Sequence, residues 1–597
     1  MTVFPVFYEK KMTIARTTSR VATLQSALSV DAPRGRYADL DKNKLRGGYY
    51  TSVQVANWLC TWAIQSAKDT ILEPSCGDGA FLEAAVRRLQ ELGARPTQIA
   101  RLLTGIEIIS DEAKTATARL RLDLGKAAER IISNSDFFAW WQASEQPAFD
   151  VIIGNPPFIR YQSFPEPHRT RAMEIMAKQG LTPNRLTNIW VPFVVAAVAS
   201  LKPGGRLALV LPAEILQVTY AGQLRSFMTD HFAHIDIIAC NELFFDNAEQ
   251  EVVLLLADGA LAAASEGNEC RVALTEAKTV ADIIENEPAI LLERSESKTI
   301  RHDSEKWLKY FLDNRQISFM RELREAAITA PMSAHASIDV GVVTGKNEFF
   351  VLSADQVDAF GLKNYTTPLI SRSVQLRGSR LNNADWKVLA AAGDRVHLLN
   401  LNNVHNDKLT TKLLRYIEEG EHKGFHKGYK CSIRKPWYLV PSVWVPDGFA
   451  FRQIYDFPRM VLNTSGATST DTIHRLRSKD DEPERVIANT YTWLTAASAE
   501  IEGRSYGGGV LELEPTEAER LLMPAKLNGA MLLSEVDSLV RAGRLDVVLE
   551  ENARIVLRGH MGLSTAECAL LKSVWTKMRD RRNSRRRGGK KIKNGAV

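Results

Sequence analysis

The chain has 597 residues, which is too long for a single hydrophobic core and predicts at least two domains. Its hydrophobic content of 45% and charged content of 24% are ordinary for a soluble globular protein, and no apolar run is long enough to cross a bilayer. The N-terminus lacks the apolar stretch of a signal peptide, and the six cysteines form no CxxC pair. We therefore expect a cytoplasmic protein with no membrane partner, no disulfide framework and no metal site.

The net charge of +6 is unevenly distributed along the chain. Residues 571–597 contain eleven Lys and Arg residues and one acidic residue, a local charge of +10, so the rest of the chain carries about −4. We interpret 571–597 as a basic, disordered tail that either adds salt-sensitive affinity for phosphates or serves only solubility. A nucleic-acid-binding face on the folded body would therefore require local clustering of positive charge.

After an N-terminal extension (1–45), residues 46–260 alternate apolar runs with amphipathic stretches. Strands are predicted at 69–75, 103–109, 130–136, 149–155, 205–212, 234–240 and 251–257, and helices at 81–93 and 111–125. This alternation predicts an α/β domain, with helices on both faces of a doubly wound, Rossmann-like sheet. Only a short connection separates the last two strands, which predicts an antiparallel hairpin at the edge of the sheet.

The composition changes after this first domain. Residues 261–310 are more polar and acidic, and we interpret them as a bridging segment. From 311 to 570 short strand patterns, turns and aromatic residues replace the strand–helix alternation. This part predicts a second domain of mixed α+β type.

The sequence ILEPSCGDGAFL (71–82) runs from an apolar strand through a Gly-x-Gly turn into a helix. Gly77 and Gly79 allow a tight turn and close approach to a ligand. Acidic residues lie in this turn or at the ends of successive strands, namely Glu73, Asp78, Glu107 and Asp136. These strand ends meet in one crevice, where carboxylates suit a ligand with ammonium and sulfonium charges and repel a pyrophosphate. The pattern therefore predicts an S-adenosylmethionine site, with Glu107 on the ribose.

The strand at 149–155 ends in Asn155-Pro156-Pro157-Phe158. The side-chain oxygen of Asn155 and the carbonyl of Pro156 can accept the two hydrogens of an adenine amine and direct its lone pair at a methyl group. The prolines restrict the backbone, and Phe158 offers a face on which the base can stack. The motif predicts methyl transfer to a base flipped out of a duplex, without a metal ion or a strong general base.

With these segments in this order, the chain resembles the gamma-class DNA adenine-N6 methyltransferases, the group of the TaqI methylase. The resemblance implies cofactor contacts for GGYYTSVQVANWL (47–59) and for the segments that hold Glu107 and Asp136. The further residues that it assigns to the cofactor are Tyr50, Thr51, Ser75, Ile108 and Phe137, with Asn155 at the same site. The segment CNELFFDNAEQEVVLLLA (240–257) would provide a second aromatic ring against the flipped base, which we assign to Phe244.

The resemblance also implies that the second domain recognises double-stranded DNA. Segments 341–352 and 503–515 are similar to parts of such domains, and the basic and aromatic stretch around 430–442 predicts phosphate contacts by Lys427, Arg434 and Lys435. The expected protein is the adenine-specific modification enzyme of a restriction-modification system, whose cognate endonuclease acts separately.

Several alternatives remain open from the residues alone. The NPPF motif also suits N4-cytosine in DNA, adenine in RNA and glutamine in proteins, because each presents an amine or amide nitrogen. A non-catalytic DNA-binding specificity subunit is a further alternative, although the intact motifs speak against it. A fused nuclease is not expected, because the sequence has no convincing nuclease motif.

Overall fold

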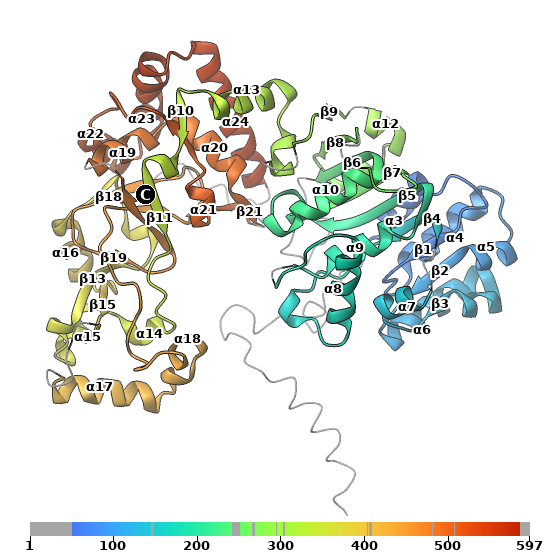
Figure 1. The fold of residues 1–597 in the computed structure, drawn as a ribbon, viewed down its shortest axis with the longest axis horizontal. Coiled ribbons are helices and arrows are strands. Elements are labelled where there is room, and N and C mark those ends of the chain that lie inside the picture. The colour runs from blue at the N-terminus through green and yellow to red at the C-terminus, as the bar shows by residue number, and fades with distance from the viewer. Residues whose placement is uncertain are drawn as a thin grey trace, which may run out of the picture.

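The chain folds into two lobes. The structure, a computed structural model, describes residues 51–144, 148–185, 187–240, 251–265, 269–293, 295–301, 305–402, 404, 409–479, 482–506 and 508–584. Figure 1 shows the first lobe in blue to green, built on one large sheet, and the second lobe in yellow to red, built from smaller sheets and many helices. Of the helices in these ranges, none is both long and apolar enough to span a membrane.

A nine-stranded sheet with the order β3-β2-β1-β4-β5-β7-β6-β8-β9 organises the first lobe. Its strands are β1 (Ile71–Glu73), β2 (Leu103–Ile106), β3 (Ile132–Ser133), β4 (Phe149–Gly154), β5 (Leu201–Pro212), β6 (Phe232–Cys240), β7 (Val252–Ala260), β8 (Arg271–Ala277) and β9 (Ser297–Lys298). The strands from β3 to β5 run parallel, with helical connections between them. The predicted Rossmann-like sheet is confirmed.

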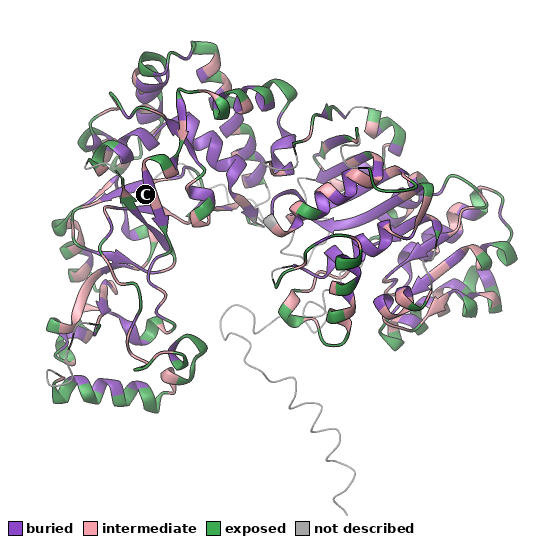
Figure 2. Cartoon of the chain, viewed as in Figure 1, coloured by how far each residue is buried: buried purple, intermediate pink, exposed green. Residues whose placement is uncertain are grey.

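Helices cover both faces of this sheet. They are α3 (Val53–Ala63), α4 (Ala80–Glu91), α5 (Pro96–Leu102), α6 (Ser110–Leu124), α7 (Phe137–Ala143), α8 (His168–Lys178), α9 (Trp190–Val198), α10 (Gly222–His231), α11 (Val280–Ile284) and α12 (Pro288–Glu293). Successive residues of β4 enter different cores: Ile152 shares one with Phe138 of α7. Val151 and Ile153 share the other with Leu59 of α3. Figure 2 shows the strands as a buried layer between the helices.

The predicted antiparallel hairpin is present as β6 and β7, but the sheet continues beyond it. β7 lies between β5 and β6 and pairs antiparallel with both. β8 then pairs parallel with β6, and β9 pairs with β8. The segment 261–310, interpreted above as a bridge, therefore supplies two strands to the sheet, which corrects that interpretation. Its acidic surroundings concealed the short buried run Val272–Leu274 of β8.

The second lobe is of mixed α+β type, as predicted. Its strands form four small sheets: β10 (Thr329–Pro331) with β23 (Leu522–Pro524); β11 (Ala336–Asp339), β20 (Ile473–Ser478), β16 (Gly448–Phe451), β18 (Met460–Asn463) and β14 (Arg380–Leu381); β12 (Val351–Leu352), β15 (His397–Leu399), β13 (Thr366–Ile370) and β19 (Thr468–Ser469); and β17 (Gln453–Ile454), β22 (Val510–Glu512) and β21 (Arg504–Tyr506). Its helices are α13 (Asn314–Glu325), α14 (Asn347–Phe350), α15 (Ala354–Ala359), α16 (Asn383–Ala391), α17 (Thr411–His422), α18 (Tyr429–Ser432), α19 (Pro483–Thr490), α20 (Trp493–Glu502), α21 (Pro515–Ala518), α22 (Leu533–Arg541), α23 (Leu545–Asn552) and α24 (Thr565–Ser584).

The prediction of a disordered tail from residue 571 is wrong as far as residue 584. Helix α24 runs to Ser584 and buries Leu571, Val574 and Met578. The side chains of Arg581 and Arg582 are only 4% and 2% exposed, because each pairs with acidic residues. The local excess of positive charge suggested disorder, since the acidic partners are far away in the sequence. Residues 585–597 lie outside the described residues.

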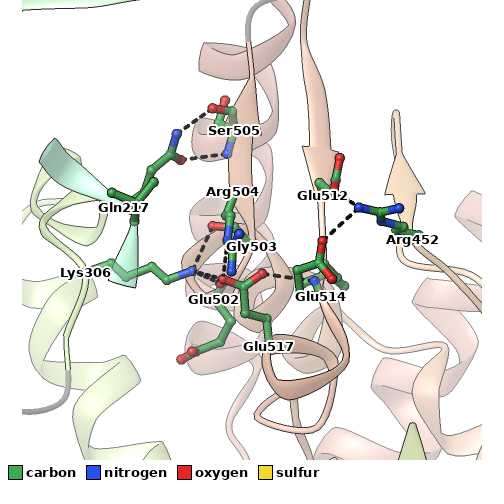
Figure 3. A network of polar contacts seen from close by, with 12 residues as sticks. Gln217, Lys306, Arg452, Glu502, Gly503, Arg504, Ser505, Glu512, Glu514 and Glu517 are labelled. Carbon is green, nitrogen blue, oxygen red and sulfur yellow. Dashed lines mark hydrogen bonds and ion pairs between the residues drawn. The ribbon is translucent and has the colours of Figure 1, made fainter. Parts of the chain in front are cut away.

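Polar contacts join the two lobes beside β21 (Figure 3). The side chain of Gln217, which follows β5, donates a hydrogen bond of 2.6 Å to the carbonyl of Ser505 and accepts one of 2.7 Å from its N–H. Lys306 forms an ion pair of 2.7 Å with Glu517, which also accepts a hydrogen bond from Arg504. Directional contacts thus hold both Gln217 of the first lobe and Lys306, in the segment between the lobes, to the second lobe.

Candidate active site

A pocket lies at the carboxyl ends of β1, β2 and β4. The sequence-predicted residues that line it are Thr51, Glu73, Ser75, Gly77, Asp78, Glu107, Ile108, Asp136, Phe137, Asn155 and Pro157. Gly79, Pro156 and Phe158 belong to the same two turns but do not line the pocket. Tyr50 and Phe244 lie outside the described residues. The structure therefore brings most of the predicted cofactor and catalytic residues together around one cavity.

The turn between β1 and α4 needs its glycines for different reasons. Gly77 has φ of +50° and Gly79 has φ of +85°, a conformation that other residues adopt only with strain. A Cβ atom on Gly79 would also lie 2.8 Å from the Cβ of Ala116 in α6. The turn therefore brings α4 close to α6, and Ala80 and Phe81 at the start of α4 line the pocket.

Glu73 is the most deeply buried acid of the pocket, with a relative exposure of 2%. Burial, followed by the nearby charges of Asp78 and Glu107, raises the pKa of Glu73 well above its usual value. Its Oε2 atom has no hydrogen-bond partner within the described part of the chain. A hydrogen bond from the backbone N–H of Leu82 favours the ionised carboxylate, and a cationic ligand in the pocket would favour it further.

The other two acids of this group have protein partners. Glu107 accepts hydrogen bonds of 2.8 Å from the N–H groups of Gly77 and Ile109, while burial raises its pKa. These bonds hold its carboxylate at the junction of β2 and the glycine turn. Asp78 forms an ion pair of 2.8 Å with Arg119 of α6. The positive charge of Arg119 offsets the negative charge of Asp78.

Asp136 lies at the start of α7. It caps the helix by accepting hydrogen bonds from the N–H groups of Phe138 and Ala139, both at 3.3 Å. Its Oδ2 atom also lies 2.9 Å from Nδ1 of His168 and 3.3 Å from a guanidinium nitrogen of Arg171. The predicted cofactor residue is therefore also the anchor of α8.

Aromatic residues that the sequence analysis missed complete the pocket. Phe193 of α9 stacks on Phe137 with ring centroids 5.2 Å apart, and Phe164 also lines the cavity. Phe193 belongs to the uniformly apolar run of α9, so nothing in its pattern separates it from an ordinary core residue. The other missed lining residues include Ile109, Glu112 and Ile159.

The predicted catalytic turn leaves β4 directly at Glu73. Gly154 has φ of +145°, and a Cβ atom there would lie 3.4 Å from the Cγ of Glu73. Asn155 then donates a hydrogen bond of 3.3 Å from its side chain to the hydroxyl of Thr51. The N–H of Ile189 binds the carbonyl of Ile159 at 2.9 Å, which ties the chain after the turn to the start of α9. The Asn155 carboxamide is thus fixed in the wall of the acidic pocket.

In the second lobe, Lys427 and Lys435 are exposed beside a shallow depression that they line together with Arg434 and Trp437. Arg434 donates hydrogen bonds of 2.7 Å to the carbonyls of Val343 and Thr344. Two of its N–H groups are therefore engaged in holding the turn before α14. Lys427 and Lys435 have the exposure that a phosphate contact requires.

Known proteins match both lobes. A family model described as the Eco57I restriction-modification methylase matches residues 82–245, and a model described as the C-terminal domain of the type II methyltransferase M.Eco57I matches residues 304–557. The chain belongs to the type II restriction-modification methyltransferases. This confirms the resemblance to restriction-modification methylases that the motifs indicated.

Curated type II methyltransferases resemble the chain over different lengths. M.AccI of Acinetobacter calcoaceticus is 22% identical over 510 residues, which cover 83% of this chain and 88% of M.AccI. M.TthHB8I of Thermus thermophilus is 31% identical over 192 residues, covering 32% of this chain and 40% of that protein. The solved structure of the type IIL restriction-modification enzyme MmeI in complex with DNA covers 90% of this chain and 73% of its own, with 14% identity and a TM-score of 0.48.

Proposed function

We propose that this type II methyltransferase transfers a methyl group from S-adenosylmethionine to the exocyclic N6 of an adenine flipped out of double-stranded DNA. The observation that carries the proposal is the position of Asn155. Its carboxamide lies in the wall of the same pocket as the glycine turn and the buried Glu73, whose Oε2 atom has no hydrogen-bond partner among the described residues. A cation-binding pocket and an amide suited to an amine thus share one cavity.

The residues of the pocket fit S-adenosylmethionine. Glu73 would face its positively charged methionine end, and Glu107 its ribose hydroxyls. Ile108, which is 51% exposed, and Phe137 with Phe193 would enclose the adenine ring. When bound, S-adenosylmethionine supplies an electrophilic methyl group on its sulfonium. The carboxylates would favour this cation over a dinucleotide, whose phosphates they repel.

The chain's own contribution to transfer would be acceptors rather than a base. The side-chain oxygen of Asn155 and the carbonyl of Pro156 would accept the two amine hydrogens of the flipped adenine and orient the nitrogen lone pair. Pro156 and Pro157 limit rearrangement of these acceptors, so they are in place before the methyl group moves. Phe158, and Phe244 from the segment after β6, would stack on the base, and stacking of this kind contributes about 1–3 kcal/mol per base.

The second lobe would hold the duplex. Lys427 and Lys435 would contact phosphates, which position the DNA without reading its sequence. As in the usual organisation of a restriction-modification system, a separate endonuclease would cut the same site when it is unmodified.

Analysis of the modified nucleoside tests this proposal. Genomic DNA from cells that express the protein is digested to nucleosides, and the methylated nucleosides are identified by mass spectrometry. We expect N6-methyldeoxyadenosine in one sequence context. A variant with Asn57→Ala, on α3 and outside the pocket, should leave the product unchanged. N4-methylcytosine, or the absence of any methylated nucleoside, would contradict the proposal.

A further inference from the structure

The two oxygen atoms of the Asp136 carboxylate have different partners. Among the described residues, Oδ1 accepts a single hydrogen bond, from the N–H of Phe138, and Asp136 lines the pocket. Oδ2 meets the N–H of Ala139 together with the side chains of His168 and Arg171. Because a carboxylate offers about four acceptor positions, Oδ1 retains capacity for a donor from the pocket, whereas Oδ2 is fully used.

The two partners of Oδ2 stand in the first turn of α8. This helix begins only a short distance after the catalytic turn, so residues 159–167 connect the turn to the helix. Phe164, within this connection, contacts Phe138 of α7 with ring centroids 6.3 Å apart and lines the pocket. The connection therefore has two fixed ends: β4 beside Glu73, and α8 on Asp136.

The ionic contact of Asp136 with His168 and Arg171 is partly buried. The side chain of Asp136 is 10% exposed, that of His168 24% and that of Arg171 34%. The cluster is thus more shielded than a surface ion pair, for which the contribution is close to zero. Its geometry depends on the rotation of one carboxylate group, because that rotation carries Oδ1 and Oδ2 together.

We propose that Asp136, His168 and Arg171 form a clamp. It couples the binding of the cofactor to the position of residues 155–178, which run from the catalytic turn through α8. A donor from the bound cofactor on Oδ1 fixes the rotation of the carboxylate, and this holds Oδ2 against α8. His168 and Arg171 are then positioning residues that touch neither substrate nor cofactor. This inference rests on the proposed function, since it requires S-adenosylmethionine in the pocket.

Hydrogen–deuterium exchange of the full chain tests the clamp without measuring activity. With S-adenosylmethionine added, the wild type should become protected in peptides that span 71–82 and 103–109, and also in peptides that span 159–178. In Arg171→Ala the first protection should persist and the second should disappear. Arg171→Lys, which keeps the charge but not the two-pronged guanidinium, should restore part of it. Lys178→Ala, an exposed position at the other end of α8, is the matched control and should behave as the wild type.

Equilibrium dialysis provides the second measurement. Because coupling is reciprocal, Arg171→Ala and His168→Ala should each weaken binding of S-adenosylmethionine, by about fivefold or more for a typical coupling. If S-adenosylmethionine does not protect residues 71–82 of the wild type from exchange, the result contradicts the proposed function. Protection at 71–82 with none at 159–178, or with an unchanged pattern in Arg171→Ala, would overturn the clamp and leave the function intact.

Discussion

Arg582, in the last turn of α24, donates two hydrogen bonds to the carboxylate of Glu500 in α20, at 2.6 and 3.1 Å. Both side chains are almost completely buried, with 2% and 4% exposure. Arg582 also donates to the carbonyls of Tyr455 and Gly509. The C-terminal helix is therefore part of the second lobe's core, and this arginine is not available to contact DNA phosphates.

The first prediction concerns this pair. Arg582→Ala leaves Glu500 buried without its partner, and removal of one member of a buried pair typically costs about 3–5 kcal/mol. Urea denaturation should show a loss of this size in the transition of the second lobe. Arg554→Ala, which removes an exposed ion pair with Glu551, is the control and should leave the stability of the protein almost unchanged. Equal losses in the two variants would contradict the structural role of Arg582.

The second prediction concerns proton uptake and release at Glu73. Burial raises its pKa, and a cation beside it would favour the ionised carboxylate and lower that pKa again. Binding of S-adenosylmethionine should therefore release protons, and its affinity should increase as the pH rises toward and through the raised pKa. Isothermal titration calorimetry in buffers of different ionisation enthalpy measures this release.

The matching variants separate the charge of Glu73 from its shape. Glu73→Gln should weaken binding and abolish the proton release, because the amide does not titrate. Glu91→Gln, at the exposed end of α4, should change neither quantity. Proton release that persists in Glu73→Gln would assign it to another group.

The third prediction is a pH dependence of stability from Asp236 in β6. Burial raises the pKa of Asp236 to about 6, above the value of about 3.9 for an exposed aspartate. The unfolded chain therefore loses this proton at lower pH than the folded protein. The contribution of Asp236 to the free energy of unfolding is therefore fully present below about pH 4 and is lost as the pH rises through the folded pKa of about 6.

Asp236→Asn removes this loss. Its melting temperature should exceed that of the wild type at about pH 8 by a few degrees and should match it near pH 4. Calorimetry at the two pH values measures the difference. The same shift at both pH values would show that packing, and not ionisation, is responsible.

The fourth prediction concerns the exposed lysines beside α18. If Lys427 and Lys435 each contact one phosphate, each Ala substitution should reduce the slope of log affinity against log salt by about one. Fluorescence anisotropy with a duplex containing the methylated site measures the slope. Lys387→Ala, on α16, should leave it unchanged. An unchanged slope in Lys427→Ala or Lys435→Ala would exclude that residue from the interface.

The sequence allowed good predictions wherever local pattern determines structure. β1 ends in Glu73, and the apolar strands β2 and β4 are followed directly by Glu107 and Asn155. Parallel strands place such ends at one edge of the sheet. The glycine turn could also be predicted from the sequence, because the backbone conformation and the close approach of Ala116 exclude other residues at Gly79. These features explain why most of the pocket could be predicted.

The remaining parts depend on partners distant in the sequence. Phe193 forms a pocket wall only because α9 packs against α7, which its apolar sequence does not indicate. Arg581 suggested a charged tail, whereas it is buried in ion pairs with Glu251, directly before β7, and with Glu276 of β8. The contact between Asp136 and Arg171 likewise requires the fold of the segment between them. Tertiary pairing of charges was therefore the main information that the sequence patterns lacked.

The most direct test of the central claim is to compare methyl transfer and cofactor binding in Asn155→Ala. We expect transfer of labelled methyl groups to DNA to be lost, while the dissociation constant for S-adenosylmethionine stays close to that of the wild type. This separation would follow from an amide that orients the target amine and contributes little to the cation site. Methylation of DNA by Asn155→Ala at a near wild-type rate would contradict the account.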